Sequence, residues 1–312
     1  MVGPTSLVAR ILSRRALTYT DGAQPAEDRP AHVRAASGVV RVGSRLCVLQ
    51  DDAGFIATIE PDGRVDSLAL PRRGGRRRFE ERFGNRLTKP DLEAGDVVAG
   101  PEGPRLLALG SGSLPVREVA VLATPRPGTE IGLLDASPLF DALRSALDIP
   151  REQVNVEGCV AMDGVLRLFQ RGPTSASVDF ELASVVAWLD GGPSACPRGE
   201  SVRRYDLGNE GGVLFGFSDA AAIGDGRVVC LAVAEDTDDP VEDGAILGSR
   251  VGIIEGAVVR LGPLLDEEDR PVMSKAEGIC PDPARPGRFH VVLDPDDPDL
   301  SAELCEVEVT GL

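Results

Sequence analysis

Four acidic residues occupy related places in short phrases that recur along the sequence. They are Glu93 in "DLEAG", Glu157 in "NVEGC", Asp219 in "FSDAA" and Glu277 in "KAEGI". In a first copy, "VRAASG", the same place falls at Ala36, and successive places are 57 to 64 residues apart. Carboxylates gathered at one point can bind Ca²⁺ or Mg²⁺, which prefer oxygen ligands. They can equally accept hydrogen bonds from backbone N–H groups and lock neighbouring strands together, and both interpretations stand at this stage.

The segments between these acids predict the elements that position them. Each interval holds about four short runs of Val, Ile and Leu bounded by Gly, Pro or Asp, which is the strand content of one propeller blade. The last interval lacks one such run, and "SLVARILS" (Ser6–Ser13) at the other end of the chain can supply it. We therefore predict an all-β fold, a five-bladed β-propeller of four-stranded blades closed by pairing of the N- and C-terminal strands. A six-bladed propeller is the alternative.

Helix is expected in one place only. "SPLFDALRSALDIP" (Ser137–Pro150) has apolar residues at helical spacing and a proline near each end. We expect it to be a short insertion near 137–150 in a single propeller domain that spans 1–312, since the repeats cover nearly the whole chain.

Composition narrows the range of partners. The chain has 33 Lys and Arg against 50 Asp and Glu, a formal net charge of −17, so neither nucleic acid nor a membrane surface is an expected partner. No signal-like apolar segment opens the chain and no run of about 18 apolar residues occurs, so a cytoplasmic location is expected. The expected partners are a small anionic molecule or a protein.

The predicted geometry gathers the repeated acids. The innermost strand of each blade lines the central channel of a propeller, so equivalent positions form a ring near one mouth. Residues two positions earlier share the same strand face, which adds Arg34, Asp91, Asn155, Phe217 and Lys275. The carboxylates would repel one another unless a cation or basic neighbours offset their charge. The candidate ligands of a calcium or magnesium ion are Glu93, Glu157, Asp219 and Glu277.

A glycine-rich turn on the same predicted face suggests an anion site. "GSGSLPVR" (Gly110–Arg117) offers backbone N–H groups and the Arg117 guanidinium. The alternative is an ordinary turn. The complete set of candidate ligand-binding residues is Arg34, Lys89, Asp91, Ser111, Ser113, Arg117, Asn155, Arg171 and Lys275.

Three further segments are predicted to have plainer roles. The acidic loops "AEDTDDP" (Ala234–Pro240) and "DPDDPD" (Asp294–Asp299) are expected to be solvated turns. The segment "PRRGGRRRFEERFGNR" (Pro71–Arg86) holds seven arginines and is expected to pair with the acidic surface, although it could also attract an anionic ligand.

The phrases "KPDLEA", "NVEGC", "KAEGI", "LLALGSGSLPVRE" and "LRLFQRG" resemble those of phytase-like propeller proteins with proposed esterase-like activity and of related uncharacterised bacterial propellers. The resemblance implies a five- or six-bladed propeller and a phosphoester or ester substrate.

Three functions follow from these residues and this resemblance. The first is a metal-assisted hydrolase of phosphoesters, esters or lactones. The second is a non-catalytic propeller that binds a small anion or a protein partner at the channel mouth, and the third is a scaffold. With His32 and His290 as the only histidines, a Ser-His-Asp triad is not favoured.

Overall fold

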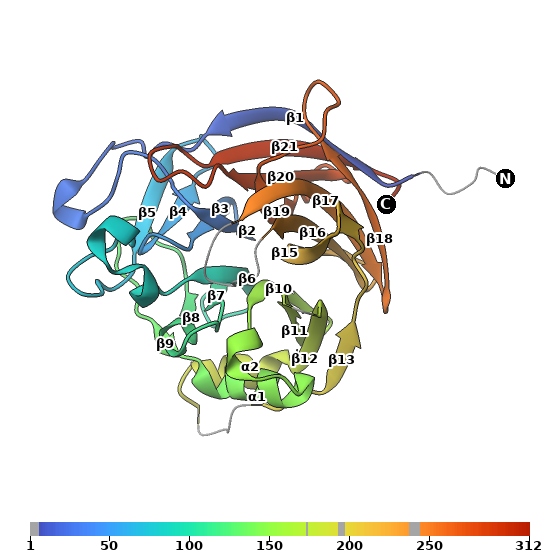
Figure 1. The fold of residues 1–312 in the computed structure, drawn as a ribbon. Helices are drawn as coiled ribbons and strands as arrows, with labels where there is room; N and C mark the ends of the chain where they lie inside the picture. Colours follow the sequence, from blue (N-terminus) through green and yellow to red (C-terminus); the bar gives the residue numbers. More distant parts are fainter. Residues whose placement is uncertain (1–5, 173, 193–196, 237–243) are drawn as a thin grey trace.

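The computed structural model describes residues 6–172, 174–192, 197–236 and 244–312. These residues form an all-β structure in which sheets are arranged around a centre in the manner of a propeller (Figure 1). The first sheet consists of β2 (Ala36–Val42), β3 (Arg45–Gln50), β4 (Phe55–Ile59) and β5 (Val65–Ala69). The second consists of β6 (Leu92–Val98), β7 (Arg105–Gly110), β8 (Val119–Ala123) and β9 (Leu134–Asp135). The third consists of β10 (Val156–Met162), β11 (Val165–Gln170), β12 (Ala176–Glu181) and β13 (Ser201–Arg204).

The remaining strands form one nine-stranded sheet. Its order is β14 (Asn209–Glu210), β15 (Val213–Gly224), β16 (Arg227–Asp236), β17 (Ala245–Glu255), β18 (Val258–Leu265), β1 (Val8–Ala16), β21 (Glu303–Thr310), β20 (Arg288–Asp294) and β19 (Lys275–Pro281). Strands β1 and β21 pair antiparallel from Val8 opposite Thr310 to Ala16 opposite Glu303. The N-terminal strand therefore pairs with the C-terminal strand. By contrast, β1 meets β18 in parallel at only Ala9 and Arg10.

The innermost strands hold the arrangement together. β2 contacts β6, β6 contacts β10, β10 contacts β15, β15 contacts β19, and β19 contacts β2. Figure 1 shows these strands closest to the centre, with the outer strands radiating away from them. Apolar clusters lie between neighbouring sheets; Leu49 of the first sheet, for example, packs in one cluster with Leu106 of the second. Burial of these faces is the main stabilising contribution to such a fold.

Two α-helices lie on the outside of the second and third sheets. α1 (Ser137–Leu147) buries Leu139, Phe140 and Leu143 against them. The expectation that helix occurs only near 137–150 is wrong, because α2 (Leu182–Leu189) follows β12 directly. Its run "LASVVAWL" is almost wholly apolar and resembles a buried strand, although Val185 and Leu189 are spaced one helical turn apart and both are buried.

Short 3-10 helices occupy several connections: Pro25–Glu27, Glu81–Phe83, Arg86–Thr88, Pro115–Arg117 and Arg151–Gln153. No helix in the described part of the chain is both long and apolar enough to cross a membrane. The cytoplasmic location stays a prediction.

Candidate functional site

A polar cavity of about 150 Å³ opens where the innermost strands begin. Most of the predicted site residues contribute to its wall: Arg34, Lys89, Asp91, Glu93, Arg117, Asn155, Glu157, Arg171, Lys275 and Glu277. Ser111, Ser113 and Asp219 are not part of the wall. The strand starts thus bring together basic and acidic groups from every sheet in a space large enough for a small molecule.

A β-bulge at the start of each innermost strand positions the acids. The register with the second strand shifts between Leu92 and Ala94, between Val156 and Gly158, and between Ala276 and Gly278. The extra residues are Glu93, Glu157 and Glu277. A bulge bends the strand and changes the direction of its side chain, which explains why the glutamates reach the cavity.

The bulges also correct the predicted repeat register in two places. In β2 the shift lies between Ala36 and Gly38, and in β15 between Phe217 and Asp219. The equivalents of the three glutamates are therefore Ser37 and Ser218, one residue away from the predicted Ala36 and Asp219. Each serine hydroxyl donates to a carbonyl of the next innermost strand: Ser37 to Leu92, and Ser218 to Ala276 at 2.6 Å.

Asp219 is a structural residue, and its assignment as a metal ligand is wrong. Its Oδ1 accepts the N–H of Ala220 and its Oδ2 accepts the N–H of Ile279, both at 2.8 Å, which fastens β15 to β19. Burial raises the pKa of Asp219 well above its usual range, and the two backbone donors oppose that rise. Asp96 joins β6 to β10 in the same manner through the N–H of Ala161 at 2.7 Å.

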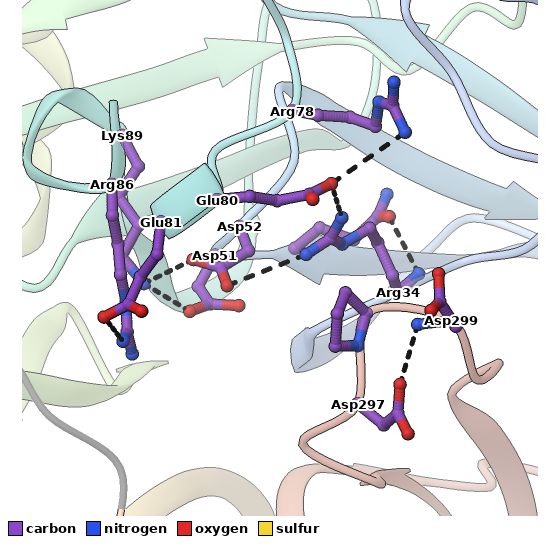
Figure 2. A network of polar contacts seen from close by, with 12 residues as sticks. Arg34, Asp51, Asp52, Arg78, Glu80, Glu81, Arg86, Lys89, Asp297 and Asp299 are labelled. Carbon is purple, nitrogen blue, oxygen red and sulfur yellow. Dashed lines mark hydrogen bonds and ion pairs between the residues drawn. The ribbon is translucent and has the colours of Figure 1, made fainter. Parts of the chain in front are cut away.

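Lys89 is the centre of the first charged network. Its Nζ lies 2.6 Å from Asp51 Oδ2, 2.8 Å from Asp52 Oδ1 and 2.8 Å from Asp91 Oδ1. Figure 2 shows the ammonium group pointing toward the two aspartates of the β3–β4 connection. Burial opposes the charge of Lys89, but these carboxylates outweigh it and raise the pKa of the ammonium group well above its usual value.

Arg117 is almost fully buried, at 2% exposure, yet its hydrogen bonds are incomplete. Its Nη1 donates to Ser113 Oγ and Asp91 Oδ2, each at 2.8 Å, while Nε and Nη2 have no partner in the described structure. The Ser111 hydroxyl group donates a hydrogen bond to Asp91 Oδ2. Ser111 and Ser113 therefore orient Asp91 and Arg117, and do not themselves form the cavity wall. An unpaired buried N–H group is costly, so Arg117 offers strong donors to an incoming acceptor.

Asp91 has an unusual backbone conformation that serves this arrangement. Its φ of 56° lies in the left-handed region, which Asp tolerates better than most residues. Burial alone would raise the pKa of its carboxyl group, but Lys89 and Arg117 hold that pKa below its usual value. Asp91 is therefore a carboxylate at neutral pH.

Arg171 and Lys275 are the cations of a second network on the other side of the cavity. Arg171 Nη2 lies 2.7 Å from Glu235 Oε2, and Lys275 Nζ lies 3.0 Å from Glu235 Oε1. Arg171 also approaches Glu157 at 3.7 Å, and Asn155 donates to Glu157 Oε1 at 2.6 Å. Burial nevertheless raises the pKa of Glu157 to about 8, against the lowering effect of Arg171.

Gly216 allows Arg171 to reach this position. A Cβ atom at Gly216 would lie 2.7 Å from Arg171 Cγ, closer than real Cβ contacts permit. The fourth innermost strand thus contributes a small residue at the place where Asp91, Asn155 and Lys275 stand on other strands.

Glu93 and Glu277, like Asp294 in the same wall, have carboxyl groups that no hydrogen bond or ion pair engages within the described residues. Burial, reinforced by Asp91 and Glu157, raises the pKa of Glu93 well above its usual range. Burial also raises the pKa of Glu277 to about 7, although Lys275 and Arg171 oppose the shift. A carboxyl group with a pKa near 7 can both accept and donate a proton at neutral pH.

Three acids have the geometry of a cation site. One carboxylate oxygen from each of Asp51, Asp91 and Glu93 lies within 4.8 Å of the other two. Oxygen ligands of this kind suit calcium or magnesium, and burial together with the charge of Asp52 raises the pKa of Asp51 to about 6. The residues fit a divalent cation, which would compete with the Lys89 ammonium group for the same oxygens.

The prediction missed several acids in the cavity wall. They come from the ends of the second strands and the connections that follow: Asp51, Asp52, Glu235, Asp294, Asp296 and Asp297. The expectation that "DPDDPD" is only a solvated turn is therefore wrong, and so is the same expectation for Glu235 in "AEDTDDP", of which residues 237–240 lie outside the described residues. A signal was present in three of the second strands, because β3, β16 and β20 each run into an acid ("LQDD", "VAED", "VLDPD").

The arginine-rich segment borders the cavity and pairs with acids, as predicted. Arg77 binds Glu27 and Glu130, and Arg78 Nε lies 3.0 Å from Asp28 Oδ1. Glu80 of this segment accepts a bond from Arg34 at 2.5 Å, and Figure 2 shows Arg78 reaching the same carboxylate. Arg34 is thereby held at the edge of the cavity.

Comparison with known proteins identifies the family. The model of a family of unknown function, DUF6929, matches residues 32–309. The chain belongs to the DUF6929 family. Comparison with curated proteins finds no significant match.

Solved structures with a similar arrangement of sheets are distant in sequence. A GH43 beta-1,3-galactosidase is 10% identical, with a TM-score of 0.55 over 94% of this chain and 58% of the galactosidase. The DUF6929 chain thus spans little more than half of that protein. Glutaminyl cyclase of Myxococcus xanthus is 10% identical, with a TM-score of 0.46 over 98% of both chains. A putative gluconolactonase is 15% identical, with a TM-score of 0.44 over 98% of this chain and 93% of its own. The likeness to the galactosidase supports the β-propeller fold alone.

Proposed function

We propose that this DUF6929 protein is a hydrolase of small anionic phosphoester, ester or lactone substrates, which it binds in the cavity at the channel mouth. The observation that carries the proposal is that one cavity wall contains both an arginine with unpaired nitrogens and a carboxyl group without a partner in the described residues. Within the described residues, Arg117 has two buried guanidinium nitrogens without partners, and Glu277 has a carboxyl group without a partner and with a pKa raised to about 7. The first suits an anionic oxygen and the second suits proton transfer.

Each group has a role in this scheme. The Nε and Nη2 of Arg117 bind an anionic oxygen of the substrate, since Nη1 is already engaged by Asp91. Glu277 removes a proton from the attacking water in one step and returns one to the leaving oxygen in the next. Glu157, with its higher pKa of about 8, stays protonated at neutral pH and donates a hydrogen bond to the substrate.

The cation belongs to the same proposal. Asp51, Asp91 and Glu93 would hold calcium or magnesium, which when bound would polarise a substrate oxygen. The likeness of the repeated phrases to phytase-like propellers supports phosphoesters as one substrate class.

The proposed architecture is a single five-bladed propeller. β1 pairs with β21 along its length but meets β18 at two residues, so we assign β1, β21, β20 and β19 to one blade and β15 to β18 to another. The closed ring of contacts among the innermost strands supports this count over the six-bladed alternative.

Hydrolysis of a substrate panel tests the function. We expect turnover of at least one aryl phosphate, aryl ester or lactone, increased by calcium or magnesium. Replacement of Glu277 by Gln keeps the shape of the side chain and removes its titration, so the rate should fall by a factor of about 10² to 10⁴. Glu255→Gln, a change at the exposed end of β17, should leave the rate unaltered. Absence of turnover with every class and cation would overturn the proposal.

A second function is favoured by one observation. Lys89 already satisfies Asp51, Asp52 and Asp91 without a metal ion, which suits a non-catalytic protein that binds an anion or a protein partner at the same face. In that case phosphate or a carboxylic acid should raise the thermal midpoint, by an amount equivalent to about 2.7 kcal/mol at 100 times Kd. The shift should disappear in Arg117→Gln, and no compound should be turned over.

A further inference from the structure

A second cavity lies at the opposite end of the strands. It has a volume of about 340 Å³ and is bordered by the β2–β3 hairpin, the turn after β4, and strands β1, β20 and β21. Arg41 of β2 lies four residues beyond Ser37, which borders the first cavity, so about 13 Å of strand separates the two. The second cavity is therefore a separate site from the channel-mouth cavity.

Arg41 is the central polar group of this cavity. It is half-buried, its Nε atom is inaccessible and lacks a hydrogen-bond partner, and its guanidinium group forms no ion pair with a described residue. This is notable in a chain with a net charge of −17. Only Nε is removed from water without a partner, so the two terminal nitrogens remain accessible to an acceptor in the cavity.

The acids near Arg41 are already engaged. Glu60 is bound by Arg45, and Glu306 is bound by both guanidinium nitrogens of Arg285 at 3.3 Å. Of the other arginines in the wall, Arg14 pairs with Glu267 and Glu303. Arg15, also in the wall, donates to the carbonyl oxygen of Gly63 and has no carboxylate partner in the described residues. Arg41 is thus the arginine of the described wall whose guanidinium group makes neither an ion pair nor a hydrogen bond with another described residue.

His290 provides a second polar atom in the same wall. Its Nδ1 is buried and has no partner in the described residues. Burial and the nearby charge of Arg41 lower the pKa of His290, so the imidazole is neutral at pH 7 and can donate one hydrogen bond. Arg41 and His290 come from β2 and β20, which belong to different sheets.

The floor of the cavity is apolar. Leu46, Ile59 and Leu304 are all buried and contribute to its wall. A ligand that fits both parts has an anionic group at one end and a compact apolar group at the other. An inorganic anion could accept hydrogen bonds from the polar residues but would make no apolar contact with the three leucine and isoleucine side chains.

We propose that this cavity binds a small organic anion, whose anionic oxygens accept hydrogen bonds from Arg41 and His290 and whose apolar part packs on Leu46, Ile59 and Leu304. The anion is a phosphate monoester or a carboxylate, since both present paired oxygens to a guanidinium group. The site is independent of the hydrolase proposed for the channel mouth.

Calorimetric titration with phenyl phosphate, benzoate and benzyl alcohol tests the proposal. We expect one of the two anions to bind more than tenfold more tightly than the neutral alcohol, and the stronger anion identifies the head group. Arg41→Gln should weaken that binding at least tenfold, and Arg41→Lys should weaken it less because the charge is kept. Arg126→Gln is the control, because Arg126 is exposed, lies outside the cavity wall and pairs with Glu102, which is also outside it.

Two further variants separate the outcomes. Arg117→Gln removes the donors of the channel-mouth cavity, so binding that survives Arg117→Gln and is lost in Arg41→Gln belongs to the second cavity. If Arg41→Gln does not fold, His290→Asn serves in its place and should also weaken binding. Unchanged affinity in the folded Arg41 or His290 variant, or failure of both anions to bind the wild-type protein, would overturn the proposal.

Discussion

The ammonium group of Lys89 lies 2.8 Å from the carboxylate of Asp91, a residue only two positions further along the chain. The left-handed backbone of Asp91 turns its side chain into the cavity, where Arg117 approaches the other oxygen at 2.8 Å. A buried carboxylate between two cations keeps its charge at neutral pH. Asp91 therefore belongs to the proposed cation site and also holds Arg117, the donor of the proposed anion site.

Removal of the Lys89 charge should be strongly destabilising. In Lys89→Met, three carboxylates lose their shared partner in a buried setting, and loss of one member of a buried ion pair costs about 3–5 kcal/mol. Urea unfolding at pH 7 measures the change in the free energy of unfolding. Arg126→Met is the control, because Arg126 and Glu102 form an exposed pair that contributes about 0–1 kcal/mol.

The same variant reports on the metal site. If Asp51, Asp91 and Glu93 hold a divalent cation, calcium or magnesium should restore part of the stability lost in Lys89→Met and should act less on the wild-type protein. Equal stability of the variant with and without these ions would argue against the cation site.

Stability should depend on pH through the cavity acids. The pKa of Glu157 is raised to about 8, that of Glu277 to about 7 and that of Asp51 to about 6, whereas unfolded Glu and Asp titrate near about 4.3 and 3.9. Acids with raised pKa values stabilise the folded state fully below the unfolded pKa, and this contribution is lost as the pH rises through the folded pKa. The free energy of unfolding should therefore decline between about pH 5 and pH 8.

The decline can be assigned to one residue. Glu157→Gln cannot ionise, so the upper part of the decline, near pH 7 to 8, should become shallower in this variant. Chemical denaturation at half-unit pH intervals gives both curves. A wild-type curve that stays level, or a variant curve parallel to it, would contradict the assignment.

Asp219 should matter for stability and not for ligand binding. In Asp219→Asn, an amide group faces one of the backbone N–H donors of Ala220 and Ile279, and a buried donor without an acceptor costs about 1–3 kcal/mol. Asp225→Asn, at an exposed turn of the same sheet, should change stability little. Thermal unfolding measures stability, and titration with phosphate shows whether the channel-mouth cavity is intact. A loss of phosphate binding without a loss of stability would show that Asp219 acts in the site.

The sequence predicted the sheets better than it predicted the site. The strands are predicted by runs of apolar residues in the sequence. The pairing of Val8–Ala16 with Glu303–Thr310 is predicted because the last repeat lacks one such run. The β-bulges are not, because one extra residue in a strand leaves no mark in composition. Asp219 was therefore aligned with Glu157 and Glu277, although Ser218 is their equivalent.

The cavity acids outside the repeated phrase were missed for a related reason. Asp51 and Asp294 lie at the ends of second strands, and their approach to Glu93 and Glu277 depends on how tightly the sheets pack around the centre. Likewise, the missing partners of Arg117 and Arg41 depend on packing, and a sequence pattern carries no sign of an unsatisfied N–H group.

The central claim is that the channel-mouth cavity performs hydrolysis with Glu277 as its proton-transfer group, and the pH dependence of kcat/KM tests it most directly. With the best substrate of the panel, the wild-type profile should show a limb with an apparent pKa near 7, the value for Glu277. In Glu277→Gln that limb should be absent and kcat lower by a factor of about 10² to 10⁴. A Glu277→Gln variant that retains both the wild-type rate and the wild-type limb would contradict the account.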